Sequence, residues 1–112
     1  MEKTLIIDGN EVKFKTSAAL PRIYRQLFKR DVFIDLNKAR SGISKKKDDL
    51  PVDALETIEN LAFCMARYAD PEVGNDITEW LGQFSTTSIY MIASQILEMW
   101  NEEQKVTSIP KK

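Results

Sequence analysis

Few residues of this chain have the types and spacing that catalysis requires. Its 112 residues include no histidine and a single cysteine, Cys64. The commonest general base, the usual zinc ligand sets and every Ser–His or Cys–His nucleophile pair are therefore excluded. The four glycines are too far apart to form a phosphate-binding loop. Paired carboxylates occur in polar stretches, at Asp48-Asp49 and Glu102-Glu103, where solvated surface is the expected role. We expect a non-enzymatic protein with no cofactor and no metal ion.

Length and hydrophobic content indicate one globular domain. A chain of 112 residues with 43% hydrophobic residues is long enough to bury a core. No apolar run is long enough to span a membrane. One cysteine cannot form an internal disulfide, which fits a reducing cytoplasm.

The net charge of −1 combines two regions of opposite sign. Residues 13–47 hold eleven basic and two acidic residues, a local net charge of +9, and residues 48–103 hold one basic and twelve acidic residues, a local net charge of −11. The two regions could pair within one monomer, align neighbouring copies, or present a basic surface to nucleic acid. The candidate basic patch, for self-association or phosphate contact, consists of Arg22, Arg25, Lys29 and Arg30.

Residues 4–15, TLIIDGNEVKFK, predict a β-hairpin. Asp8-Gly9 is a turn signal between two runs of strand-forming residues. A lone hairpin is marginal in water, so its apolar face must cover helices or a partner chain. Its outer edges are available for pairing with another copy. The predicted apolar face consists of Leu5, Ile7, Val12 and Phe14, with Ile6 on the other face.

Four to five helices are expected after the hairpin, which gives a mainly α fold with a small β part (α+β). Pro21 suits the first position of a helix that continues, bent or interrupted, to just before Gly42. Residues 51–69 are the clearest helix. Asp76 and Glu79 form a capping signature for the next one, and residues 85–101 predict a last helix.

The expected domain covers residues 1–103 as a single hairpin-plus-helix unit. A mobile loop is expected near residues 41–50, because turn residues, a charge switch and Pro51 coincide there. A flexible tail is expected over residues 104–112.

The last predicted helix has more apolar surface than one core face needs. Either it lies deep in the bundle or it presents a second face to a partner. Tyrosine and tryptophan are enriched at interface cores, although a buried structural role is the alternative for each of them. The candidate partner-binding residues are Trp80, Phe84, Tyr90, Leu97 and Trp100.

Three stretches carry a family resemblance. They are EKTLIIDGNEVKFKTSAALPRIYRQLFKRDVFIDL at residues 2–36, LETIENLAFCMARYADPEV at residues 55–73, and ITEWLGQFSTTSIYMIASQILEMWN at residues 77–101, before an ending of the form TS-x-PKK. In this order they resemble the small tail assembly chaperones of long-tailed bacteriophages and prophages of Gram-positive hosts. Leu20 departs from the threonine cap expected there, and Lys29 stands where a glycine would end the helix more cleanly.

The resemblance implies a non-enzymatic protein that binds the tape measure protein, a long and largely helical chain that sets tail length. Such chaperones keep it soluble in the host cytoplasm until tail tube subunits polymerise around it, and are absent from the mature virion. In related phages, programmed frameshifting gives a longer form whose extension recruits the tail tube protein. Lys111-Lys112 is consistent with a slippery codon run, and a frayed terminus is the plain alternative.

As a mechanism we expect many copies, each with modest affinity, to hold amphipathic helices of the tape measure protein in a groove. This expectation places the groove at residues 89–100 and around Trp80 and Phe84. It predicts that Trp100→Ala damages binding more than folding. The main alternative is a small nucleic-acid-binding phage regulator that uses the basic 22–47 region. A second alternative is a virion structural protein such as a connector or tube subunit.

Overall fold

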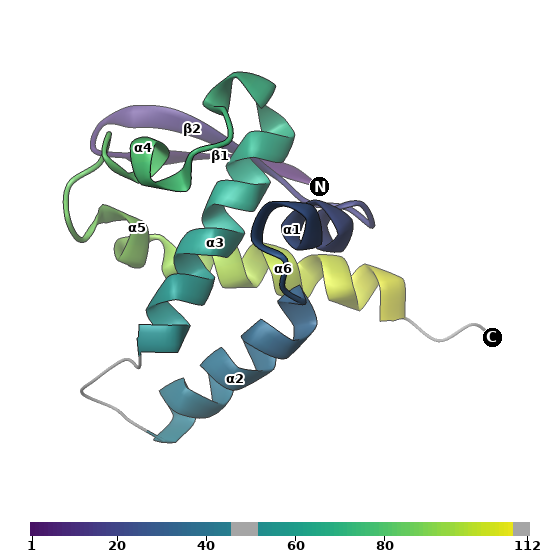
Figure 1. Cartoon of the computed structure of the whole chain (residues 1–112). Coiled ribbons are helices and arrows are strands. Elements are labelled where there is room, and N and C mark those ends of the chain that lie inside the picture. The colour runs from purple at the N-terminus through teal and green to yellow at the C-terminus, as the bar shows by residue number, and fades with distance from the viewer. Residues whose placement is uncertain (46–51, 109–112) are drawn as a thin grey trace.

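The chain begins with a β-hairpin in the computed structural model (Figure 1). The structure describes the backbone of residues 1–45 and 52–108, and the side chains of residues 1–40 and 54–102. Within these ranges the hairpin is followed by six α-helices and one 3-10 turn. The predicted α+β class, mainly α with a small N-terminal β part, is confirmed.

Two strands, β1 (Glu2–Ile7) and β2 (Asn10–Lys15), form the hairpin and pair antiparallel with Ile7 opposite Asn10. Asp8 and Gly9 connect them with φ angles of 53° and 81°. Positive φ at both central residues is what a type I′ turn requires, and its twist matches that of the strands. The turn predicted at Asp8-Gly9 is therefore confirmed.

One face of the hairpin packs against helices, as the alternation predicts. Ile7 and Phe14 are buried, and Leu5 and Val12 are partly buried against the same core. Ile6, which points to the opposite face, is 60% exposed. Burial of the apolar face supplies the stability that an isolated hairpin lacks.

The hairpin turn is also tied to a segment far along the chain. The carboxylate of Asp8 accepts a hydrogen bond from the Ser88 hydroxyl at 2.6 Å and one from the Ser85 amide at 2.7 Å. The Ser88 hydrogen bond is the main cause that holds the pKa of Asp8 below its ordinary value of 3.8. These two bonds fix the closed end of the hairpin over the C-terminal helices.

The helices follow the order of the predicted apolar segments, but there are more of them than the four to five expected. Their bounds are α1 (Leu20–Phe28), α2 (Val32–Lys45), α3 (Val52–Ala69), α4 (Ile77–Leu81), α5 (Ser88–Met91) and α6 (Ala93–Ser108), with the 3-10 turn η1 (Pro71–Val73) after α3.

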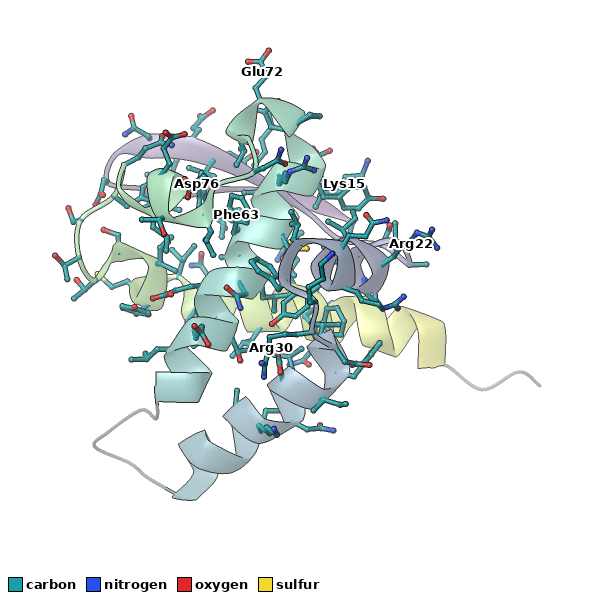
Figure 2. The ribbon with its side chains drawn as sticks, in the orientation of Figure 1. Lys15, Arg22, Arg30, Phe63, Glu72 and Asp76 are labelled. Atoms are coloured by element: carbon teal, nitrogen blue, oxygen red, sulfur yellow. The ribbon has the colours of Figure 1, made fainter. Side chains whose placement is uncertain are left out.

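Helix α3 runs through the middle of the fold, with the hairpin and the other helices around it (Figure 1). All residues from Leu61 to Ala66 are fully buried. A helix that is buried on every side needs apolar or small residues all round, and this stretch, LAFCMA, provides them. The Phe63 side chain lies near the centre of the molecule (Figure 2).

Three helix boundaries differ from the sequence-based expectation. Gly42 does not end α2, which continues to Lys45, because one glycine costs a helix only about 1 kcal/mol. The last predicted helix divides at Ile92, which separates α5 from α6 and raises the number of helices. Helix α6 then extends to Ser108, beyond the expected end of the domain at residue 103.

These boundaries correct the expected loop and tail in part. Residues 41–45 of the expected mobile loop are helical, and so are residues 104–108 of the expected flexible tail. The remainder of the loop, and residues 109–112 with Lys111-Lys112, lie outside the described residues. Among the described helices, none is both long enough and apolar enough to cross a membrane.

Candidate partner-binding cleft

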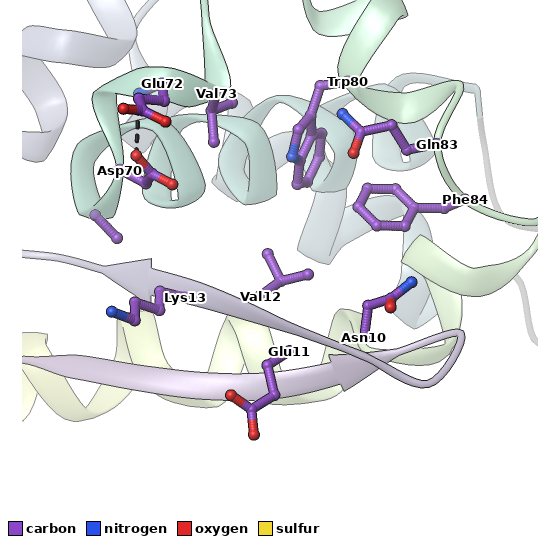
Figure 3. A pocket seen from close by; sticks show the side chains of 11 residues that line it. Asn10, Glu11, Val12, Lys13, Asp70, Glu72, Val73, Trp80, Gln83 and Phe84 are labelled. Atoms are coloured by element: carbon purple, nitrogen blue, oxygen red, sulfur yellow. Dashed lines mark hydrogen bonds between the residues drawn. The ribbon is translucent and has the colours of Figure 1, made fainter.

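An open cleft of about 720 Å³ lies between β2, the end of α3 with η1, and α4 (Figure 3). Its walls come from three segments that are far apart in the sequence. They are residues 10–13, residues 69–73 and residues 80–84, and the lining residues are Asn10, Glu11, Val12, Lys13, Ala69, Asp70, Glu72, Val73, Trp80, Gln83 and Phe84.

The hairpin contributes one wall through consecutive residues of β2. Val12 belongs to the apolar face of the hairpin, and its side chain points toward Trp80 and Phe84 (Figure 3). Glu11 and Lys13 also line the cleft although the strand alternation turns their side chains to the other face. Neighbouring residues of both faces can line one cleft because the cleft runs along the edge of the strand.

The opposite wall is the short helix α4, whose start is fixed by Asp76. The Asp76 carboxylate accepts hydrogen bonds from the amides of Thr78 at 3.0 Å and Glu79 at 3.2 Å. This part of the predicted capping signature is confirmed. Trp80 then points inward, with its ring centroid 5.6 Å from that of Phe63.

Phe84 follows α4 and forms the exposed side of the aromatic wall. Its ring meets the ring of Trp80 edge to face, at a centroid distance of 5.1 Å. Trp80 is 3% exposed and Phe84 is half-buried. The tryptophan thus anchors the wall in the core, and the phenylalanine presents apolar surface to the cleft.

The third wall is the turn that follows α3. Asp70 ends the helix and accepts a hydrogen bond from the amide of Glu72 at 3.0 Å, which starts η1. Val73 is half-buried and packs against the core. Glu72 points outward from this end of the molecule (Figure 2). Residues Asp70-Pro71, a predicted helix stop, therefore place one apolar and two acidic side chains beside the aromatic wall.

The cleft has an apolar floor and a mainly acidic rim. The acidic residues on its helical side are Asp70 and Glu72, whereas Glu11 and Lys13 line it from the strand and carry their side chains on the other face. A segment with apolar side chains and a net positive charge complements this lining.

The structure separates the predicted partner-binding residues. Trp80 and Phe84 lie together in the cleft, whereas Tyr90, Leu97 and Trp100 do not line it. Trp100 is 3% exposed and contacts Phe33, with ring centroids 5.4 Å apart. The groove expected along residues 89–100 contributes no lining residue to this cleft and stays a prediction.

Tyr90 and Leu97 occupy half-buried positions outside the cleft. The Tyr90 hydroxyl donates a hydrogen bond to the Glu59 carboxylate of α3. This bond to a carboxylate, together with partial burial, raises the pKa of Tyr90 to about 12. Their roles in partner binding stay predictions.

The predicted basic patch also divides into two kinds of residue. Arg22 and Arg25 are exposed on α1, Lys29 is exposed directly after it, and Figure 2 shows Arg22 directed away from the fold. Arg30 instead binds Asp35 through two hydrogen bonds, of 2.8 Å and 2.9 Å. Arg30 is exposed as well, but its ion pair with Asp35 holds the guanidinium group against the fold.

The Arg30–Asp35 pair is completed by a buried tyrosine. The Tyr24 hydroxyl donates a hydrogen bond to Asp35 at 2.8 Å. The bonds from Arg30 are the main cause that lowers the pKa of the Asp35 carboxyl below its ordinary value of 3.8. Burial raises the pKa of Tyr24, and the neighbouring carboxylate raises it further. This network joins α1 to α2 and is structural.

Some residues of the cleft were not predicted as candidates. Asn10, Asp70, Glu72 and Gln83 are polar residues at turns or strand ends, and no periodicity marks them. A proline after an aspartate signals a helix end, but it does not tell which other segment lies beside that end.

The single cysteine lies in the core of the described part of the chain. Cys64 is buried, its thiol faces the Leu20 carbonyl at 3.9 Å, and burial raises its pKa to about 12. Among the described residues, no three cysteine or acidic side chains gather to hold a metal ion.

Comparisons of this chain with protein-family models, curated proteins and solved structures found no match.

Proposed function

We propose that this protein is a tail assembly chaperone of a long-tailed bacteriophage or prophage, which binds the tape measure protein. The observation that most supports this proposal is the composition of the cleft. Each of the three stretches that carry the family resemblance, residues 2–36, 55–73 and 77–101, contributes one wall. The segments behind the resemblance thus also build a surface suited to a polypeptide partner.

The chemistry of the cleft supports an apolar partner with basic side chains. Before its tube forms, a tape measure protein presents apolar stripes that would otherwise aggregate. Val12, Trp80 and Phe84 offer apolar contact to such a stripe, and the carboxylates of the rim favour lysine or arginine beside it. The protein needs no catalytic group for this role.

Many copies with modest affinity provide strong binding along a long chain. Each contact can be displaced singly by an arriving tail tube subunit, while the sum of the contacts keeps the tape measure protein soluble. Contacts between neighbouring copies can use the exposed cations Arg22 and Arg25 on α1 and Lys29 at its end. Because these are surface charges, salt weakens such contacts.

The remaining parts of the proposal concern location and a longer form. We place the protein in the host cytoplasm during assembly and not in the mature virion. A longer product, made by frameshifting near Lys111-Lys112, recruits the tail tube protein. A coding sequence without a slippery run, or without an overlapping downstream frame, would remove this last part only.

Co-expression with the tape measure protein of the same phage tests the proposal. A C-terminal affinity tag is suitable, because the N-terminal ammonium group donates to the Thr16 carbonyl at 2.9 Å and closes the hairpin. The expected result is a soluble tape measure protein that co-purifies with many copies of this chain. The purification is repeated after nuclease treatment and at raised salt, to separate protein contacts from nucleic acid.

Each alternative function predicts a different outcome of this experiment. Nuclease-sensitive nucleic acid in the eluate, lost at raised salt, would support the regulator instead. Recovery of the chain from purified phage particles would support a virion structural protein. A tape measure protein that stays insoluble with this chain, and also with the longer frameshifted form, would contradict the chaperone proposal.

A further inference from the structure

The outer edge of β2 faces the cleft with unpaired backbone groups. The amide and carbonyl of Thr16 exchange two hydrogen bonds with Met1, both of 2.9 Å. Residues 1 and 16 are therefore a hydrogen-bonded pair of the antiparallel ladder. Such pairs alternate with pairs whose backbone groups point outward. This alternation, applied to the register in which Leu5 lies opposite Val12, identifies the outward-pointing residues.

Glu11 and Lys13 of β2 are in the outward-pointing class. Their register partners are Ile6 and Thr4, and the intervening residues Asn10 and Val12 are in the hydrogen-bonded class. Among the hydrogen bonds found between described residues, none outside the ladder involves Glu11 or Lys13. Both line the cleft. The cleft thus offers two amides and two carbonyls at the spacing of a strand edge.

We infer that the cleft binds an extended segment of its partner as a third strand on β2. This mode gives affinity through backbone hydrogen bonds and specificity through alternate side chains. It rests on the proposed function for the identity of the partner, but not for the mode of contact. It differs from the helix-in-groove mode expected from the sequence, because a helix satisfies its own backbone groups and leaves those of Glu11 and Lys13 unpaired.

The side chains around the edge define the sequence of the partner segment. On the inner side, alternate residues of the added strand lie against Val12, Trp80 and Phe84, so they are apolar. The acidic rim at Asp70 and Glu72 favours lysine or arginine between them. The predicted ligand is an extended segment of alternating apolar and cationic residues.

Amide hydrogen exchange with a defined probe tests this mode. The probe is an acetylated peptide of alternating lysine and valine, about eight residues long, as strands commonly are. The expected result is slower exchange at the amides of Glu11 and Lys13 and little change at Asn10 and Val12, which are already bonded to β1. No binding, or binding without protection of Glu11 and Lys13, would overturn the inference. A peptide of alternating glutamate and valine should bind about tenfold more weakly or worse.

Matched proline variants of the two hairpin edges test the same point. Lys13→Pro removes an outward amide from the cleft edge, and Thr4→Pro removes its register partner from the far edge. Proline is tolerated at edge positions whose amide is not in the ladder. Lys13→Pro should weaken binding of the lysine–valine peptide about tenfold or more, while Thr4→Pro binds nearly as the unchanged protein does. Equal effects of the two prolines would contradict strand addition.

The complex with the tape measure protein separates this inference from the proposed function. If the complex forms but Glu11 and Lys13 exchange as in the free chain, the third-strand mode is wrong and the chaperone proposal stands. If no complex forms and the lysine–valine peptide still protects both amides, the chaperone proposal is wrong and the binding mode stands.

Discussion

The rings of Trp80 and Phe84 meet edge to face, with centroids 5.1 Å apart and planes at 78°. The two residues form one wall of the cleft and have different roles in it. Trp80 also contacts Phe63 of the central helix and is almost fully buried, whereas Phe84 lies at the opening and is half-buried. Substitutions of the two residues therefore have different consequences. Loss of Trp80 damages the core, and loss of Phe84 removes contact surface.

Replacing Trp100 should cost stability before it affects any partner. Its side chain is 3% exposed and packs against Phe33, so Trp100→Ala leaves a cavity and should lower the free energy of unfolding by about 3–5 kcal/mol. This differs from the sequence-based expectation that binding suffers most. Urea unfolding of the variant, with Trp100→Phe as the conservative control, measures it. A loss below about 1 kcal/mol would mean that this residue is not a core residue.

Asp35 should make the protein less stable in acid. Its folded pKa is lowered, chiefly by the Arg30 hydrogen bonds, so the unfolded state binds more protons as the pH falls below the ordinary value. The stability that Asp35 contributes is fully present above about pH 4 and is lost as the pH falls through the folded pKa. At neutral pH, Asp35→Asn should cost about 1–2 kcal/mol.

Denaturant unfolding over a pH series measures this contribution. The difference in stability between the unchanged protein and Asp35→Asn should shrink as the pH falls below about 4. Tyr24→Phe keeps the Arg30 pair and removes one hydrogen bond to Asp35. Its difference in stability from the unchanged protein should therefore vary less with pH than that of Asp35→Asn. A difference that is the same at every pH would mean that the carboxylate is not held by its partners.

Lys29→Gly should stabilise the protein. Lys29 ends α1 in the left-handed region, with φ of 58°, while its amide donates to the Arg25 carbonyl at 2.8 Å. A side chain in this conformation costs about 1 kcal/mol that glycine avoids. Thermal unfolding should show a gain of about that size for Lys29→Gly and none for Lys29→Ala. If glycine were less stabilising than alanine, backbone strain at this cap would be excluded.

Asp76→Ala should loosen α4 and with it the aromatic wall. The carboxylate accepts hydrogen bonds from two amides at the start of a helix of only five residues. Its loss should lower the free energy of unfolding by about 1 kcal/mol. Thr78→Ala, a change at an exposed residue of the same helix, is the control and should lie within about 0.5 kcal/mol of the unchanged protein. Equal stability of both variants would contradict the capping role.

Local sequence signals predicted much of the fold. The Asp8-Gly9 turn, the buried face that includes Ile7 and Phe14, and the capping carboxylate of Asp76 each follow from residues close together in the chain. The glycine expected in place of Lys29 corresponds to an observed left-handed cap. These features depend on backbone preferences and strand or helix period, which a sequence records directly.

The cleft could not be predicted in the same way. Its walls, residues 10–13, 69–73 and 80–84, meet only through packing around α3. The split at Ile92 similarly decides which apolar residues of the last segment face the core. Met99 is fully buried and Met91 is 77% exposed. Neither belongs to the apolar stripe that the helical period predicts for this segment, which consists of Ile89, Ile92, Ala93, Ile96 and Trp100. Helical periodicity shows that this segment has more apolar residues than one core face needs, but it does not tell which of them are buried and which are exposed.

If the proposed chaperone holds the tape measure protein in the cleft, shortening an apolar side chain of the cleft weakens binding more than shortening one elsewhere. Phe84→Ala and Leu97→Ala each shorten a half-buried apolar side chain, but only Phe84 lines the cleft. Both variants are first confirmed as folded by circular dichroism. Each is then co-expressed with the tape measure protein, and the amount retained per copy of the chain is measured. We predict that Phe84→Ala retains about tenfold less or worse, while Leu97→Ala retains nearly as much as the unchanged protein. Undiminished retention by Phe84→Ala would contradict binding of the tape measure protein in the cleft.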